Sequence, residues 1–219
     1  MNCGSILSQS IPTLQITDSV KKAKDCMGES GFEDLPVLQE QIFRGLLHIS
    51  DLEELNDDLL LSELADHFTY LFVSEQDFFL VALNKMQNAH VQCLPVMGIS
   101  GEYVGAITLE RIADIVGRYL SASEPGGIII LQMPAHQFSI SELGRIVESN
   151  NAKILHLATW TDPAIGELMV SMKVNKIDIQ DILASFERYE FAVYQYFGEN
   201  LSEDTLKNNF DNLMHYLRL

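Results

Sequence analysis

Two segments, near residues 20 and 80, carry apolar side chains at the three- and four-residue spacing of an amphipathic helix. Each segment is followed by Leu-Pro-Val, which starts a short strand, since proline is tolerated at the first residues of a strand or on an edge. Turn residues then separate this strand from a second apolar stretch, which predicts a β-hairpin. The apolar helix positions are Val20, Ala23 and Met27 in the first segment and Phe79, Ala82, Leu83 and Met86 in the second.

The two segments are copies of one pattern. Each key position of the first segment recurs 59 residues later, and beyond Leu-Pro-Val the correspondence continues one residue out of step. A constant spacing of this length predicts a duplicated supersecondary unit. The corresponding pairs are Ala23 and Ala82, Met27 and Met86, Leu35 and Leu94, and then Gly45 and Gly105.

Each copy ends in a polar stretch and a predicted closing helix. His48 to Asp51 leads into a helix at Leu52–Leu55, and Thr108 to Arg111 leads into one at Ile112–Tyr119. This combination resembles the CBS domain, whose tandem copies form a Bateman module. Its parts are a helix with Ala-x3-Met, a Leu-Pro-Val strand, a hairpin and an end similar to Gly-h-h-Thr-x-x-Asp, where h is an apolar residue. The resemblance covers roughly residues 7 to 120.

The pattern changes after residues 121–127, a cluster of small and turn residues that predicts a linker. The following elements have the order β-α-β-β-α-β of a ferredoxin-like domain, and they resemble the ACT domain, a regulatory module that often binds amino acids. A capping box at Ser139 to Glu142 opens the first helix. The strands are expected at Ile128–Met133, Lys153–Trp160, Glu167–Val174 and Phe191–Phe197, with the second helix around residues 179–186.

We therefore predict an α+β chain in which a CBS-domain pair, a duplicated β-α-β-β-α unit, precedes a ferredoxin-like βαββαβ domain. The last part, with Leu206, Phe210, Leu213 and Leu217 at helical spacing, predicts an amphipathic C-terminal helix. This domain order resembles the acetoin-utilisation regulatory type of bacterial protein. The expected boundaries are 1–61 and 62–122 for the repeats, 123–127 for the linker, 128–200 for the ACT-like domain and 201–219 for the helix.

Charge limits the function classes. The chain has 14 basic and 31 acidic residues, a net charge of −17, and both halves are acidic. It therefore offers no electropositive face for nucleic acid, and anionic membrane surfaces repel it. No apolar run approaches the roughly 20 residues of a membrane helix, and Met1 to Ser5 do not begin a secretory signal. The cysteine count of three is odd, and Cys26 and Cys93 lie in apolar parts of the repeats, which fits buried thiols in a reducing compartment, so we expect a cytoplasmic protein.

The CBS resemblance implies clefts that bind adenosine ligands such as AMP, ADP, ATP or S-adenosylmethionine. A hydroxyl and an aspartate of the end motif then hold the ribose, because a carboxylate accepts from both diol hydroxyls. The second repeat has Arg111 at the carboxylate position, which suits a phosphate or else pairs with Glu110 or Asp114. The candidate residues are His48, Ser50 and Asp51 in the first repeat and Thr108 and Arg111 in the second.

Other candidates are fewer. The ACT resemblance implies a ligand loop at Pro134, Ala135 and His136, although this loop lacks the glycine usual there. His90 and Cys93 have a metal-like spacing, but zinc needs four ligands and no second pair accompanies them. No nucleophile with a base and no phosphate-binding glycine loop is present, so we expect no enzyme, metal or cofactor.

Two function classes remain. The first is a regulatory sensor in which the CBS pair binds an adenosine ligand and the chain forms a homodimer through its apolar helix faces. The ACT-like domain would serve as a second sensor or as a dimerisation unit. The second is a dimeric interaction scaffold that binds no small molecule, which the incomplete ribose motifs favour.

Overall fold

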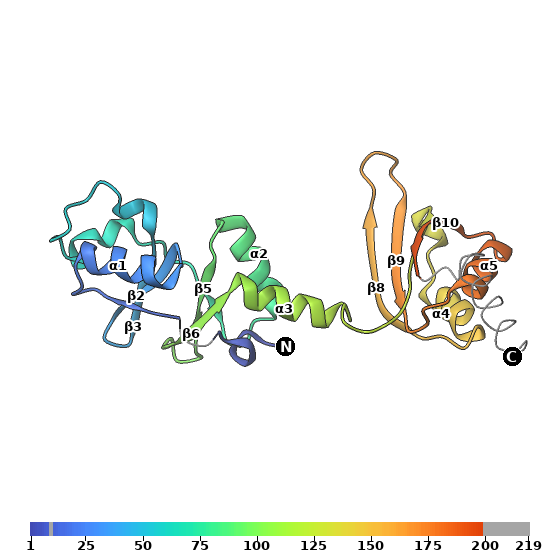
Figure 1. The fold of residues 1–219 in the computed structure, drawn as a ribbon, viewed down its shortest axis with the longest axis horizontal. Coiled ribbons are helices and arrows are strands. Elements are labelled where there is room, and N and C mark those ends of the chain that lie inside the picture. Colours follow the sequence, from blue (N-terminus) through green and yellow to red (C-terminus); the bar gives the residue numbers. More distant parts are fainter. Residues whose placement is uncertain (9–10, 199–219) are drawn as a thin grey trace, which may run out of the picture. The chain divides into compact units, whose positions relative to one another are not determined.

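The computed structural model describes residues 1–8 and 11–198, and the chain divides into two compact units, Met1–Val116 and Gly117–Leu219. The N-terminal unit holds two three-stranded sheets (Figure 1). In each sheet a two-residue strand pairs in parallel with one strand of an antiparallel hairpin. The strands are β1 (Leu14–Gln15), β2 (Asp34–Gln39) and β3 (Ile42–His48), then β4 (Val73–Ser74), β5 (Cys93–Met97) and β6 (Tyr103–Thr108).

The helices of this unit bury the predicted faces. Val20, Ala23 and Met27 are buried on α1, as are Phe79, Ala82 and Met86 on α2. None of the helices within the described ranges has the length and apolar character to cross a membrane. The helices are α1 (Val20–Ser30), α2 (Phe79–Ala89) and α3 (Leu109–Tyr119), and the 3-10 segments are η1 (Cys3–Ile6), η2 (Ile49–Leu52) and η3 (Leu61–His67).

The two hairpins confirm the duplication in three dimensions. Leu35 pairs with Leu47 in the first hairpin, and Leu94 pairs with Ile107 in the second. Each hairpin also has a bulge at the same place, directly after the valine of Leu-Pro-Val, which lies opposite a glycine. The two repeats therefore share one backbone design, and equivalent positions can be compared directly.

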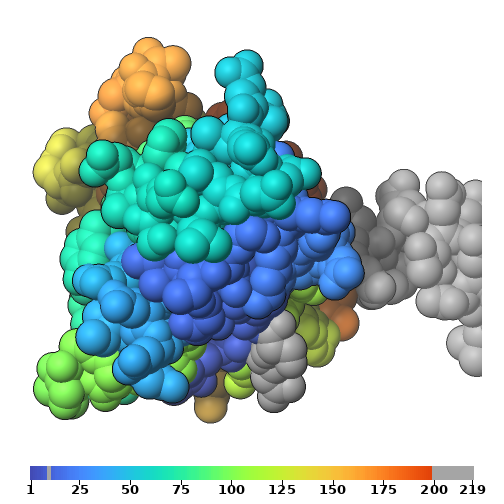
Figure 2. Space-filling view, turned by 90° about the vertical axis from the view of Figure 1, so that its left-hand side faces the viewer, coloured from blue at the N-terminus to red at the C-terminus, as the bar shows by residue number. Residues whose placement is uncertain are grey.

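The predicted closing helix at Leu52–Leu55 is wrong: the first repeat has only the short η2 there. The predicted segment is only one turn long, which is too short to form a stable helix by itself. The chain instead runs back along the start of α1, where the Val20 N–H donates to the Leu59 carbonyl at 2.8 Å. In Figure 2 these blue and teal segments lie against each other on the surface.

The segment that precedes each repeat pairs with the other repeat. The Ser8 N–H donates to the Ala106 carbonyl of β6 at 2.9 Å. In the same way, Thr69 and Leu46 of β3 exchange two backbone hydrogen bonds of 2.9 Å. Cys3 and Ile6 of η1 are buried in the core of the second repeat. The N-terminal arm is thus a structural part of the second repeat rather than of the first.

The C-terminal unit has the predicted ferredoxin-like topology. Its four-stranded antiparallel sheet has the order β10-β7-β9-β8, so β7 lies between two other strands as the prediction requires. The predicted C-terminal helix lies outside the described residues. The elements are β7 (Ile128–Met133), η4 (Ala135–Gln137), α4 (Ile140–Ser149), β8 (Ile154–Thr161), β9 (Leu168–Val174), α5 (Gln180–Arg188) and β10 (Ala192–Phe197).

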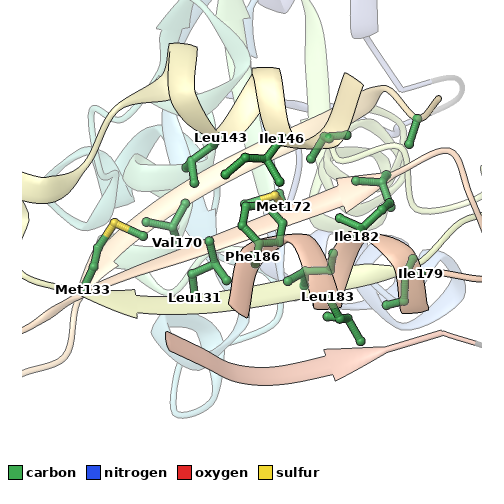
Figure 3. Packing of buried hydrophobic residues seen from close by; sticks show 14 residues of the cluster. Leu131, Met133, Leu143, Ile146, Val170, Met172, Ile179, Ile182, Leu183 and Phe186 are labelled. Atoms are coloured by element: carbon green, nitrogen blue, oxygen red, sulfur yellow. The ribbon is translucent and has the colours of Figure 1, made fainter. Parts of the chain in front are cut away.

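Both helices of this unit contribute to a single core. Leu143 and Ile146 of α4 and Phe186 of α5 point toward Val170 and Met172 of β9 (Figure 3). The Ser139 hydroxyl accepts the Glu142 N–H at 3.4 Å, which is the serine half of the predicted capping box at the start of α4. Alternating burial along β7 shows that one face of the sheet packs on the helices.

Candidate functional site

A cavity of about 310 Å³ lies between the repeats, at the end of β6 and the start of α3. The N-terminal arm, the first repeat and the second repeat all contribute to its wall. The lining residues are Leu7 and Ser8 from the arm, Phe32 from the first repeat, and Thr108, Glu110, Arg111 and Asp114 from the second. The wall of this cavity therefore combines apolar side chains with hydroxyl, carboxylate and guanidinium groups.

Thr108 is held by the arm. It is the last residue of β6 and is buried. Its N–H donates to the Ser8 hydroxyl at 2.9 Å, and the two hydroxyl oxygens are 3.0 Å apart. The Thr108 hydroxyl also accepts the Arg111 N–H at 3.2 Å in the first turn of α3. Thr108 therefore fixes the arm, the strand end and the helix start relative to one another.

Arg111 extends this contact with the arm. Its Nε–H donates to the Ile6 carbonyl at 3.3 Å. Within the described ranges it forms no ion pair with Glu110 or Asp114, so its guanidinium keeps donors for a ligand. Asp114 was not among the predicted site residues, although its position three residues after Arg111 places it on the same helix face. A guanidinium suits a phosphate, and carboxylates suit hydroxyl donors.

The structure does not bring all five predicted residues together. His48, Ser50 and Asp51 lie at the end of β3 and in η2, which the duplication makes equivalent to the end of β6 and the start of α3. His48 Nδ1 is 2.8 Å from the Ser50 hydroxyl and accepts the Ser50 N–H at 3.1 Å. The predicted residues thus form two groups, one in each repeat.

Asp34, which the sequence analysis did not single out, connects the two groups. It pairs with His48 across the β2–β3 hairpin, and one carboxylate oxygen accepts the Gln92 N–H of the second repeat at 2.9 Å. The other oxygen, Oδ1, lies 3.9 Å from His48 Nε2. Burial raises the pKa of Asp34, while the Gln92 N–H and His48 oppose that rise.

The predicted ACT-like loop lies beside a separate cavity of about 430 Å³ in the C-terminal unit. His136 lines this cavity together with Glu142 and Tyr189, whereas Pro134 and Ala135 are not among its lining residues. Arg145 lies 4.8 Å from the centre of the Tyr189 ring, and its hydrogen bond to the phenol oxygen lowers the Tyr189 pKa.

The metal-like spacing of His90 and Cys93 is not accompanied by further ligands. Across the residues that the structure describes, no cluster of three or more His, Cys, Asp or Glu side chains could hold a metal ion. Cys93 is buried, and burial raises the pKa of its thiol to about 12, so it stays protonated at neutral pH.

Comparison with known proteins agrees with this fold. Residues 63–118 match the CBS domain family. A solved CBS domain pair/ACT domain protein from Thermotoga maritima is 22% identical, with a TM-score of 0.50, over 55% of this chain and 99% of that chain. A putative acetoin utilization protein (AcuB) from Vibrio cholerae is 21% identical, with a TM-score of 0.48, over 57% of this chain and 96% of that chain.

A third solved structure, CBSX2 in complex with AMP, is 19% identical, with a TM-score of 0.45, over 53% of this chain and 96% of that chain. No curated protein sequence matches the chain. The second repeat therefore matches the CBS domain family, and it lies in a chain with the fold of a CBS domain pair followed by a ferredoxin-like domain.

Proposed function

We propose that the chain is a non-catalytic regulatory protein whose CBS pair binds an adenosine-containing ligand of the AMP, ADP, ATP or S-adenosylmethionine class. The observation that carries the proposal is the cavity at Thr108, which combines an apolar wall with a guanidinium and two carboxylates. CBS domains are regulatory, nucleotide-sensing modules, which supports the assignment of this class. A concave site with few convergent polar groups is the usual form of a ligand site.

Each part of such a ligand has a partner in the cavity. Phe32 and Leu7 offer apolar surface for the base, and Asp114 offers acceptors for the ribose hydroxyls. The guanidinium of Arg111 is the group suited to a phosphate. In the first repeat, Asp51 takes the ribose role and His48 replaces the hydroxyl, so the two clefts would bind the same ligand with different affinities.

Binding would be transmitted through the contacts that surround the cavity. Thr108 and Arg111 both hold the N-terminal arm, through Ser8 and the Ile6 carbonyl. A ligand that engages these two side chains therefore favours one packing of the arm and the repeats over others, which is how a ligand shifts a conformational equilibrium. The output would be a change in a protein partner or in the packing of the chain's own dimer.

We further propose that the chain is a homodimer, in the cytoplasm, through its CBS pair. Phe78, Leu80 and Val81 are large apolar side chains at the start of α2, and each is more than two fifths exposed. Clustered apolar surface of this kind marks an interface. Light scattering at micromolar concentration should give twice the chain mass; a monomer would contradict the dimer without touching the ligand proposal.

A thermal-shift panel tests the ligand class. The panel contains AMP, ADP, ATP, S-adenosylmethionine and amino acids, because a ligand that binds only the folded state must raise its melting temperature. At 100 times its dissociation constant a ligand adds about 2.7 kcal/mol of stability. Arg111→Ala should abolish most of the shift with AMP, whereas Arg118→Ala, on the exposed end of the same helix, should retain it.

A second candidate is a dimeric scaffold that binds no small molecule. The observation in its favour is that Ser8 already contacts the Thr108 hydroxyl and that Ser50 contacts His48. In this case the polar groups would only hold the arm and the turns. A flat response across the whole panel, with a dimer in light scattering, would favour the scaffold.

A further inference from the structure

Arg111 is the one basic side chain among the described residues that line the cavity at Thr108. The carboxylates of Glu110 and Asp114 line the same wall. All three charged side chains come from the first half of α3, so an anion that enters the cavity meets one guanidinium and two carboxylates. The charge of a ligand therefore decides how well it fits this wall.

Arg111 offers one fixed place for an anionic group. Its backbone N–H donates to the Thr108 hydroxyl at 3.2 Å, and its Nε–H donates to the Ile6 carbonyl at 3.3 Å. These two bonds tie the residue to the end of β6 and to the N-terminal arm, while the other guanidinium N–H groups remain available. The positive end of the α3 dipole lies at the same place and also favours an anion. One phosphate is thus well served.

The two carboxylates limit what can follow that phosphate. Glu110 directly precedes Arg111, and Asp114 lies three residues after it. Glu110 and Asp114 are four residues apart on a helix, so their Cβ atoms are neighbours at about 5–6 Å. Among the described residues neither carboxylate forms an ion pair. Their negative charge is therefore not compensated, and it repels further anionic groups next to Arg111.

The rest of the chain offers little compensation. It has 31 acidic against 14 basic residues, so the long-range field also repels anions. The cavity itself, about 310 Å³, is at the small end of the roughly 300–1,000 Å³ of ligand sites. Room and charge thus both favour a small ligand with few negative charges.

We propose that Glu110 and Asp114 make this cavity selective for a nucleoside monophosphate over the di- and triphosphate. The inference rests on the proposed function, because it takes the same cavity as the ligand site and Arg111 as the group that meets the first phosphate. Selectivity of this kind comes from repulsion of the wrong ligand rather than from an additional contact with the right one. Each further phosphate should weaken binding about three- to ten-fold at low salt.

Titration calorimetry with AMP, ADP and ATP tests the order of affinities. The buffer has low salt and no divalent cations, because a bound Mg²⁺ would mask the charge of the additional phosphates. Affinities are taken from the binding that Arg111→Ala weakens, which belongs to this cavity. AMP should bind more tightly than ADP, and ADP more tightly than ATP. Equal affinities, or a preference for ATP, would overturn the inference and leave the proposed function standing.

Two variants test whether the carboxylates cause this order. Glu110→Gln and Asp114→Asn each remove one negative charge at nearly the same size, and both positions are exposed, so the fold is kept. Each should reduce the ratio of AMP to ADP affinity several-fold. Glu40→Gln is the matched control, since Glu40 is exposed in the turn between β2 and β3, and it should keep the wild-type ratio. A wild-type ratio in both cavity variants would overturn the inference.

Salt separates repulsion from lack of room. The Debye length falls from about 10 Å at 0.1 M to about 3 Å at 1 M ionic strength, so added NaCl should reduce the ratio of AMP to ADP affinity. A ratio that does not change with salt would show that space alone excludes the larger nucleotides, which overturns the role of the carboxylates. If neither AMP, ADP and ATP nor adenosine and S-adenosylmethionine bind, the proposed function and this inference fail together.

Discussion

The two repeats share a helix and a hairpin of the same register, but they carry different polar side chains at equivalent positions and end differently, in η2 and in α3. Where the first repeat has His48 and Asp51, the second has Thr108 and Arg111, each 60 residues later. Where the first has buried Asp34, the second has buried Cys93, 59 residues later. Hairpin register and helix faces are thus common to the two repeats, whereas the polar side chains at the ends of β3 and β6 differ between them.

The largest expected effect tests the shared backbone. Gly45 and Gly105 both have positive φ, near 155° and 148°, because a segment from outside the repeat crosses over them. A Cβ on Gly45 would lie 2.6 Å from the Phe68 Cβ, whereas one on Gly105 would lie 3.2 Å from the movable end of Leu7. Gly45→Ala should therefore lower the free energy of unfolding by roughly 2–4 kcal/mol, and Gly105→Ala by roughly 1–2 kcal/mol.

Chemical denaturation of both variants measures this difference. An equal loss for the two would mean that the arm and the Phe68 segment pack over their glycines equally tightly. That result would contradict the asymmetry between the repeats.

The sequence predicted those parts of the fold that repeat or alternate. The 59-residue spacing identified both helix faces and both hairpins, since the same residues, such as Ala23 and Ala82, must be small where a helix approaches a sheet. The order of the C-terminal elements predicted a sheet with β7 inside it. The first closing helix did not form because the apolar pattern that suggested it covers only one turn, which is too short to be stable by itself.

The site was only partly predictable, because its contacts join residues far apart in the chain. Ser8 and Thr108 are 100 positions apart in the sequence, and no local sequence pattern predicts the hydrogen bond between them. The Asp34 interaction with Gln92 spans 58 positions. A signal was nonetheless present, since an aspartate at the start of a buried Leu-Pro-Val strand is a charge in a core position. Polar residues that interrupt an apolar repeat are therefore good site candidates.

Asp51→Ala tests the ribose role of the first cleft. Losing the charge-assisted bonds to a diol should cost about 1.5–3 kcal/mol, roughly ten-fold or more in affinity. Because the ribose is common to AMP and adenosine, both should lose equally in titration calorimetry with the Arg111→Ala background. The exposed Asp58→Ala is the matched control. A loss confined to AMP would place Asp51 near the phosphate instead.

Asp34→Asn tests the buried charge through the pH dependence of stability. Burial raises the Asp34 pKa in the folded chain, so its contribution to stability is complete at pH below the unfolded-state pKa and is lost as the pH rises through the folded-state pKa. The variant should therefore be about 1–2 kcal/mol more stable than the wild type at pH 8, with a smaller difference near pH 5.

Urea denaturation at several pH values measures this difference, with the exposed Asp25→Asn as the control. A variant that is less stable at pH 8 would show that the charge of Asp34 stabilises the repeat junction.

Ser8→Ala should have the smallest effect. It leaves the buried Thr108 N–H without its acceptor, which costs about 1 kcal/mol. Thr69→Ala, at the corresponding crossing over the first repeat, removes an exposed hydroxyl and should change the unfolding midpoint little. Equal effects in thermal denaturation would mean that the arm is held by its backbone alone.

The central claim is that the two clefts differ in the group that meets a phosphate. Titration calorimetry of the wild type and Arg111→Ala with AMP and with adenosine tests it most directly. The account predicts that Arg111→Ala weakens AMP about ten-fold or more and adenosine by a much smaller factor, since only AMP offers a phosphate to the guanidinium. Equal losses for the two ligands, or unchanged affinity for both, would contradict it.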